Sequence, residues 1–245
     1  MAVAIITGAS RGFGRALAEA LAGRGWDLVL DARSAGPLEE AAAALRRHGG
    51  AVTALAGDVA DGGHRRELVA AARELGGLDL LVNNAGVLGS VPLAPLGTYS
   101  LDDFRAALEV NVVAPLGLVQ EALPLLRAAP AGTVVCLSSD AAAEAYGTWG
   151  GYGATKAALD QLSAVLAVEE PGLRVWAVDP GGMRTGMLAA AEPDEDLSGV
   201  PRPEDVVPAF LLLFDRRPAS GRYAAPSLLE SASGPVLQDA RGEVR

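Results

Sequence analysis

Tyr152 and Lys156 are the pair of side chains best suited to proton chemistry. They are four residues apart, so on a helix they share one face, one turn apart. A free tyrosine, with a pKa of about 10, holds its proton at neutral pH. An ammonium about 4 Å away favours the phenolate by roughly 4 kcal/mol at an effective dielectric of 20. We therefore expect Lys156, the one lysine among twenty basic residues, to lower the pKa of Tyr152.

Ser139 follows an apolar run thirteen residues before Tyr152. Parallel sheets bind ligands beyond the carboxyl ends of their strands, where this hydroxyl would lie. There it would donate a hydrogen bond to a substrate carbonyl oxygen and turn that oxygen toward Tyr152. Ser138 is the neighbouring candidate, but alternation along a strand points its side chain to the opposite face.

A glycine-rich turn near the N-terminus joins an apolar strand to an alanine-rich helix. It reads Thr7-Gly8-Ala9-Ser10-Arg11-Gly12-Phe13-Gly14. Glycine permits a tight turn and a close backbone approach to a pyrophosphate, and the helix N-terminus adds free N–H groups. A tight turn without a ligand would use the same residues. The turn therefore predicts a dinucleotide site mainly because Tyr152, Lys156 and Ser139 occur in the same chain.

The elements that must hold these groups alternate between strands and helices. Apolar runs predict strands at Ala2–Thr7, Asp27–Ala32, Ala51–Ala56, Leu78–Val82, Thr133–Leu137, Leu173–Val178 and Arg222–Ala225. Helical patterns lie near 12–24, 37–48, 62–75, 101–127, 151–169 and 203–215. We predict an α/β protein with a single-domain Rossmann fold: a doubly wound, mostly seven-stranded parallel sheet flanked by helices. One domain covers 1–245, and the tail 227–245 stays unplaced.

Composition narrows the function classes. Half of the 245 residues are hydrophobic and a fifth are charged, which excludes a disordered chain. The net charge of −10 gives no broad basic field, so we expect no nucleic-acid partner. One cysteine and two histidines offer no metal site, and we expect His48 and His64 to lie on the surface.

The chain lacks the signals of export or membrane insertion. No apolar run approaches the roughly 20 residues that cross a bilayer, and the N-terminus lacks a basic region before its apolar residues. We expect a cytoplasmic protein with no membrane partner.

Taken together, the motifs resemble those of the short-chain dehydrogenase/reductase family. From residue 2 to about 225 they run in the family's order: the glycine turn, Asn83-Asn84-Ala85-Gly86, Asn111, Ser139, Tyr152-Gly-Ala-Thr-Lys156 and Pro180-Gly181-Gly-Met-Arg-Thr185. The resemblance implies a nicotinamide-dependent oxidoreductase in which Tyr152 is the general acid and Ser139 polarises the carbonyl. Lys156 would also hold the nicotinamide ribose. Asn111 would bind a water that links Lys156 to solvent, unless it is simply a buried hydrogen-bonding residue.

The resemblance also implies the residues that hold the cofactor. At the turn and adenosine end these are Gly8, Ser10, Arg11, Gly12, Phe13, Gly14, Arg33, Asp58, Val59, Asn84, Ala85 and Gly86. At the nicotinamide end they are Tyr152, Lys156, Pro180, Gly181, Met183 and Thr185. Asp58 would hold the adenine amino group, although capping of the next helix is an equal alternative.

The second predicted strand favours NADP(H), with NAD(H) as the alternative. NAD-binding members usually carry a carboxylate at the end of this strand, where Ala32 stands here. Arg33 and Arg11 suit a 2′-phosphate because the guanidinium binds phosphate bidentately. Asp31 is one residue early, so its side chain should face the other way.

Several stretches look closest to the sepiapterin reductase and benzil reductase branch, which reduces vicinal dicarbonyls with NADPH. They are residues 7–15, 83–89 and 166–175. The aspartate that anchors a pterin in that branch is replaced by alanine after Ser220-Gly221, which favours a smaller, more apolar dicarbonyl or ketone. The substrate wall would include 87–95, 145–149 and 183–192, although Tyr146 and Trp149 would serve equally in core or interface packing.

Other functions stay open. An acyl-carrier-protein ketoreductase or an NAD-dependent alcohol dehydrogenase would share the fold, and a non-catalytic NADP(H) sensor is a remote alternative. The partner expected is a small carbonyl or alcohol substrate. Relatives usually pair through their fifth and sixth helices, so we expect a homodimer or homotetramer.

Overall fold

The centre of the molecule is a sheet of seven parallel strands. The computed structural model describes residues 1–233. The strands are β1 (Val3–Ile6), β2 (Asp27–Ala32), β3 (Val52–Ala56), β4 (Leu80–Asn83), β5 (Thr133–Leu137), β6 (Arg174–Asp179) and β7 (Gly221–Ala224). Their order is β3-β2-β1-β4-β5-β6-β7, which confirms the predicted doubly wound Rossmann fold. Because β4 and β5 are buried on both faces, they read as continuous apolar runs.

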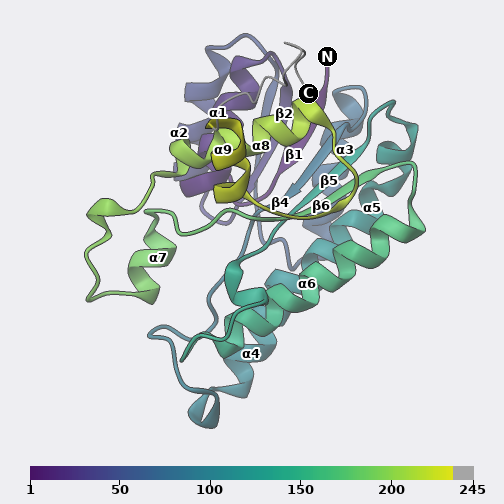
Figure 1. Cartoon of the computed structure of the whole chain (residues 1–245). Helices are drawn as coiled ribbons and strands as arrows, with labels where there is room; N and C mark the ends of the chain where they lie inside the picture. The colour runs from purple at the N-terminus through teal and green to yellow at the C-terminus, as the bar shows by residue number, and fades with distance from the viewer. Residues whose placement is uncertain (234–245) are drawn as a thin grey trace, which may run out of the picture.

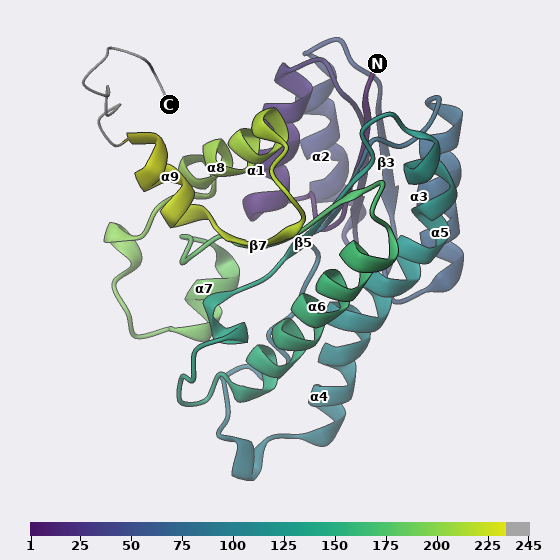
Figure 2. The ribbon, with the colours of Figure 1, turned by 45° about the vertical axis from the view of Figure 1, so that its right-hand side comes forward.

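Helices cover both faces of this sheet. One layer holds α1 (Gly12–Gly23), α2 (Ala35–Arg46), α8 (Pro203–Arg216) and α9 (Ala225–Ser233), and the other holds α3 (Gly62–Glu74), α5 (Ala114–Ala128) and α6 (Gly150–Glu169) (Figure 1). The turned view separates the two layers across the strands (Figure 2). The short helices α4 (Leu101–Leu108) and α7 (Gly186–Ala191) extend beyond the sheet at its carboxyl end.

Alternation along the strands gives each layer its own core. In β2, Leu28 and Leu30 pack with α1 and α8 residues such as Phe210, whereas Val29 packs with α3 residues such as Leu68. Two hydrophobic cores therefore fix the sheet between the helix layers and hold the carboxyl ends of the strands in place.

The structure departs from the predicted elements at three places. The helix expected over 101–127 contains a π-helical segment, Glu109–Val113, between α4 and α5. Helix α7 was not predicted, since it is only six residues long. The last strand ends at Ala224, and Ala225 begins α9 instead. Residues 227–233 of the tail lie in α9, and 234–245 lie outside the described residues.

The helical stretch Leu101–Ala128 is long enough to cross a membrane, although it contains no uninterrupted apolar run of that length. Among residues 1–233 it is the one helix that is long and apolar enough by length and composition alone. Polar residues such as Asn111, Gln120 and Glu121 interrupt its apolar part. Leu118, Ala122 and Leu126 pack into the core beneath the sheet, as expected for a core helix that meets the same criteria.

His64 is buried, contrary to the prediction that both histidines lie on the surface. Its side chain is 6% exposed, and its Nε2 lies 2.7 Å from Asp31 Oδ1. Its polar neighbours in the sequence suggested a solvated position, but α3 turns this position toward β2. Asp31 faces α3, away from the face of Ala32, as predicted.

Candidate active site

A crevice runs along the carboxyl ends of the strands and passes the switch point between β1 and β4. Its main cavity of about 790 Å³ extends from the glycine turn to Tyr152 and Lys156. A cavity of about 190 Å³ adjoins it near Arg33 and Asp58. A third, of about 510 Å³, opens on the other side of Tyr152. Ligands of open α/β sheets bind in this position.

The glycine turn needs glycine for conformation and for space. Gly8 and Gly12 have φ values of +67° and +57°, which side chains rarely adopt. A Cβ on Gly14 would lie 2.6 Å from the carbonyl oxygen of Gly8. Gly14 therefore lets the first turn of α1 pack against the loop and does not itself line the crevice.

Thr7 and Asn84 brace this turn from below. The Asn84 side chain donates to the carbonyl oxygens of Thr7 (2.7 Å) and Gly8 (3.2 Å). Thr7 Oγ1 accepts from the backbone N–H groups of Asn84 and Ala85. Asn84 lines the main cavity, but its amide is committed to the loop, so its observed role is to hold the turn.

The start of α1 fits an anionic group. The helix begins at Gly12, and Arg11 at its N-cap makes no side-chain capping bond. The first N–H groups of this helix and its partial positive charge therefore face the main cavity. This arrangement, with the glycine cradle beside it, fits a dinucleotide pyrophosphate.

The adenosine end of the crevice gathers the residues expected to recognise it. The smaller cavity is lined by Ser10, Arg11, Ala32, Arg33, Asp58 and Val59. Asp58 does not cap α3: its Oδ1 accepts from Ala60 N, and Asp61 is the N-cap, accepting from Gly63 N. Asp58 is exposed at the cavity, where it is placed to meet an adenine amino group.

Tyr152 and Lys156 lie in the first two turns of α6 and face the crevice. Both are buried, with exposures of 8% and 4%. Lys156 Nζ donates to the carbonyl oxygen of Leu137 at 2.7 Å and lies 5.5 Å from the centre of the Tyr152 ring. Trp149 packs edge-on against that ring, with centroids 5.8 Å apart. The helix thus fixes both side chains at the main cavity, and Tyr152 also borders the third cavity.

The pKa of Tyr152 is raised, whereas we expected Lys156 to lower it. Burial is the largest cause, and the carboxylates of Asp140 and Asp179 add to it, while a hydrogen bond with Ser139 opposes it. The lysine ammonium is directed at Leu137 instead of the phenol oxygen. Tyr152 consequently holds its proton at neutral pH, which suits a proton donor.

Burial lowers the pKa of Lys156 to about 8, and Cys136 and Asp160 partly oppose that shift. At neutral pH the side chain is still largely protonated. A buried ammonium at the mouth of the crevice is placed to donate hydrogen bonds to ribose hydroxyls.

Ser139 stands at the end of β5, partly buried, on the wall shared with Tyr152. Its Oγ donates to Asp140 Oδ1 at 3.0 Å and accepts from Ala141 N at 3.2 Å. Asp140 Oδ2 accepts from the Tyr146 hydroxyl at 3.1 Å. Ser138 also borders the cavity, but its side chain is buried and donates to the carbonyl oxygen of Ser139. Ser139 is the serine that hydrogen-bonds with Tyr152.

Asn111 lies below the crevice within the π-helical segment and is fully buried. Its amide donates to Val87 O (2.8 Å) and Thr155 Oγ1 (2.9 Å) and accepts from Val87 N (2.9 Å). A Cβ on Gly86 would lie 3.3 Å from Asn111 and 3.7 Å from Lys156 Nζ. Asn111 thus ties the Asn-Ala-Gly loop to α6 beside the lysine.

The nicotinamide end is a turn after β6. Gly181, with φ of +73°, is held by a hydrogen bond from its N–H to Asp179 Oδ1 at 2.9 Å. Thr185 caps α7 by accepting from Leu188 N. Pro180, Met183 and Thr185 line both large cavities.

The third cavity has mostly apolar walls. Most of its large side chains come from the three segments expected to form a substrate wall: Leu88, Tyr146, Trp149, Met183, Met187 and Leu188. Val200, in the loop before α8, completes the set. Asp140 and Glu192 add carboxylates. Asp140 was missed, although it directly follows Ser139, and the bend that points it into the cavity has no sequence signal.

Nearly all the residues proposed from the sequence border these cavities. Two differ: Gly14 and Asn111 lie behind the walls. Phe13 lines the main cavity although it is only 4% exposed, and its ring packs on Phe210 with centroids 4.4 Å apart. Arg202 and Glu204 line the main cavity but were not predicted. Among residues 1–233, no three His, Cys, Asp or Glu side chains are grouped closely enough to hold a metal ion.

The crevice, the glycine cradle and the Tyr152–Lys156 helix define a nicotinamide dinucleotide-binding oxidoreductase site. The family model for short chain dehydrogenases matches residues 2–196, and the chain belongs to this family. The sepiapterin reductase of Rattus norvegicus is 39% identical over 202 residues, which is 78% of this chain and 77% of the relative.

Solved structures agree with this assignment. A short chain dehydrogenase from Pseudomonas syringae matches with a TM-score of 0.85 and 34% identity, covering 91% of this chain and 93% of the other. Another, from Escherichia coli CFT073 and solved with NADPH, has a TM-score of 0.86 and 31% identity, covering 91% and 96%. The predicted family and fold are thereby confirmed.

Proposed function

We propose that this protein is an NADP(H)-dependent carbonyl reductase that converts a ketone or vicinal dicarbonyl to the alcohol. The observation that carries the proposal is the position of Tyr152. It separates a crevice that fits a dinucleotide from a mostly apolar cavity of about 510 Å³, and it retains its proton there.

In the proposed reaction, a substrate carbonyl lies between Ser139 and Tyr152. NADPH, when bound, supplies the hydride. The Ser139 hydroxyl donates a hydrogen bond to the carbonyl oxygen and fixes its direction. Tyr152 gives its proton to that oxygen as negative charge develops, because an alkoxide is a far stronger base than a phenolate. Lys156 donates hydrogen bonds to the ribose, and its charge stabilises the phenolate left on Tyr152.

The preference for NADP(H) over NAD(H) rests on the adenosine end. Ala32 leaves room where a carboxylate would repel a 2′-phosphate, and Arg11 and Arg33 line the same cavity. Two of the structural relatives were solved with NADP or NADPH.

A small apolar carbonyl compound fits the third cavity better than a pterin. Ala224 and Ala225 supply no carboxylate for a pterin's donor groups. The Asp140 carboxylate accepts from Ala141 N and the Tyr146 hydroxyl, and it accepts from Ser139 only until that hydroxyl turns to a bound carbonyl. Leu88, Trp149 and Met187 offer apolar contact to an aromatic or aliphatic diketone.

The experiment is NADPH oxidation at 340 nm by the purified protein with benzil, an aromatic monoketone, sepiapterin and an acyl-carrier-protein ketoester. We expect the highest kcat/KM with benzil. Turnover restricted to the carrier-bound ester would transfer the assignment to that ketoreductase class. NADPH binding without oxidation of any of these compounds would contradict the proposal.

We also propose that the protein works in the cytoplasm as a homodimer or homotetramer built through α5 and α6. Support for the assembly comes from exposed apolar side chains: Val113 just before α5, Leu116 in its first turn, and Val165 and Val168 near the end of α6. The mass in solution, as a multiple of 24.9 kDa, checks the assembly.

A further inference from the structure

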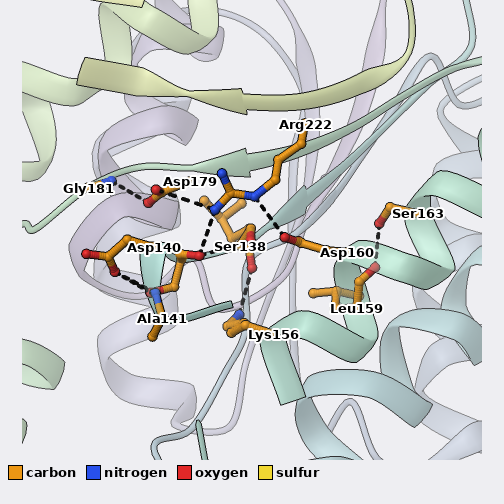
Figure 3. Close-up of polar contacts among 12 residues, drawn as sticks. Ser138, Asp140, Ala141, Lys156, Leu159, Asp160, Ser163, Asp179, Gly181 and Arg222 are labelled. Atoms are coloured by element: carbon orange, nitrogen blue, oxygen red, sulfur yellow. Dashed lines mark hydrogen bonds and ion pairs between the residues drawn. The ribbon is translucent and has the colours of Figure 1, made fainter. Parts of the chain in front are cut away.

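Arg222 lies where four segments of the chain meet, just behind the proposed active site (Figure 3). Its Nε donates to Asp160 Oδ2 on α6 at 2.9 Å. One terminal nitrogen donates to the carbonyl oxygen of Ser139 at the end of β5, also at 2.9 Å. The same nitrogen lies 3.6 Å from Asp179 Oδ2 at the end of β6. A single guanidinium therefore joins β7 to three other elements.

Each of these partners is linked directly to a group with a proposed role, through the same residue, a hydrogen bond or one helical turn. Ser139 carries the hydroxyl that would bind the carbonyl. The other oxygen of Asp179 accepts from Gly181 N in the turn at the nicotinamide end. Asp160 follows Lys156 by one turn on the same helix.

Asp160 and Asp179 depend on this guanidinium for their charge balance. Their side chains are only 17% and 10% exposed. Asp160 Oδ1 is buried and has no hydrogen-bond partner among the described residues, so its other oxygen carries the whole interaction with Arg222. Burial raises the pKa of Asp179, and Arg222 is among the groups that oppose this rise. Removing the guanidinium would leave two buried carboxylates without a cation in contact.

We propose that Arg222 is a positioning residue that fixes Ser139 and the Gly181 turn relative to the Tyr152–Lys156 helix. Only a planar fork can reach the partners on β5, β6 and α6 together, so lysine cannot fully replace arginine here. The part that concerns Ser139 rests on the proposed carbonyl reduction. The part that concerns Gly181 rests only on binding of the dinucleotide.

The test compares Arg222→Ala and Arg222→Lys with Arg24→Ala as a matched control. Arg24 has almost the same side-chain exposure, 38% against 37%, and pairs bidentately with Asp215 far from the crevice. Three quantities are measured for each variant: kcat with benzil, the Kd of NADPH, and the Kd of 2′,5′-ADP, which lacks the nicotinamide half. Melting temperatures report general stability.

For Arg222→Ala we expect kcat to fall about tenfold or more, since small displacements of reacting groups are costly. The Kd of NADPH should rise about threefold or more while that of 2′,5′-ADP stays within about twofold, because only NADPH reaches the displaced turn. Arg222→Lys should recover part of both losses. Arg24→Ala should leave kcat and both affinities unchanged.

Two results would overturn the proposal. One is an Arg222→Ala protein with kcat and NADPH affinity within twofold of the unchanged protein. The other is an equal loss of affinity for NADPH and 2′,5′-ADP together with a lower melting temperature, which would indicate general destabilisation. If the unchanged protein does not reduce benzil, the substrate proposal fails, and the ratio of the two Kd values still decides the role of Arg222.

Discussion

At the scale of single residues, Tyr152 and Lys156 show how burial changes a simple electrostatic expectation. An ammonium beside a phenol should lower the phenol's pKa, yet the pKa of Tyr152 is raised because the ring is buried and two carboxylates lie near. The same burial lowers the pKa of Lys156 to about 8. The first shift keeps the tyrosine protonated at neutral pH, and the second brings the lysine closer to its titration point.

The lowered pKa of Lys156 predicts a pH dependence of stability. In the unfolded chain its pKa is 10.5, so between pH 8 and 10.5 the unfolded state binds more protons than the folded state. Raising the pH through this window therefore stabilises the folded state. Relative to Lys156→Met, the free energy of unfolding of the unchanged protein should rise by roughly 3 kcal/mol across it. Urea denaturation at a series of pH values measures this difference.

Lys156→Arg is the control for this measurement. Arginine stays charged throughout the window, so its stability relative to Lys156→Met should not rise. A flat difference for the unchanged protein as well would show that Lys156 has an ordinary pKa in the folded state.

At the scale of elements, the alternation of side chains along strand β2 points two neighbouring residues to opposite faces of the sheet. Asp31 faces α3 and pairs with His64, while Ala32 lies on the other face and borders the adenosine cavity beside Arg33. Asp31 also accepts from Gly8 N in the glycine turn and borders the same cavity, so alternation turns its carboxylate toward α3 without removing it from the site.

Ala32→Asp should move the cofactor preference toward NAD(H). A carboxylate here would repel a 2′-phosphate and accept hydrogen bonds from the ribose hydroxyls. We expect the ratio of kcat/KM for NADPH to that for NADH to fall by at least about tenfold. The assay uses one carbonyl substrate with both cofactors.

Ala70→Asp on the exposed side of α3 adds the same charge away from the cavity and should leave the ratio unchanged. If Ala32→Asp also leaves the ratio unchanged, the assignment of this strand end to the 2′-phosphate is wrong.

At the scale of the whole molecule, burial distinguishes the only two histidines. His64 pairs with Asp31 inside the fold, and its ring packs against Gly57. His48 contacts Glu19 at the surface.

His64→Ala should lower the free energy of unfolding by roughly 3 kcal/mol, because it removes the side chain that hydrogen-bonds the buried Asp31 carboxylate and leaves Gly8 N as its remaining partner. His48→Ala, the matched control, should cost less than about 1 kcal/mol, as expected for an exposed pair. Urea denaturation at pH 7 measures both values. Equal losses would contradict the structural difference between the two pairs.

The sequence predicts most of this molecule because its strands are continuous apolar runs and its motifs are local. All seven strands lie within two residues of their predicted ends, and the glycine turn and the Tyr152–Lys156 helix lie where expected. The burial of His64 and the contacts of Arg222 were not predictable in this way. They depend on groups from distant segments, such as the Arg222 guanidinium and the Ser139 carbonyl oxygen, that meet only after the sheet has formed.

The role of Tyr152 is the central claim, and Tyr152→Phe tests it most directly. NADPH affinity and NADPH oxidation with benzil are measured on the same preparation of this variant. We expect turnover to be abolished while the Kd of NADPH stays within about twofold, because the phenylalanine ring keeps the packing against Trp149 and loses only the proton donor. A variant that binds NADPH and keeps more than a few per cent of the unchanged protein's turnover would contradict the assignment of Tyr152 as the general acid.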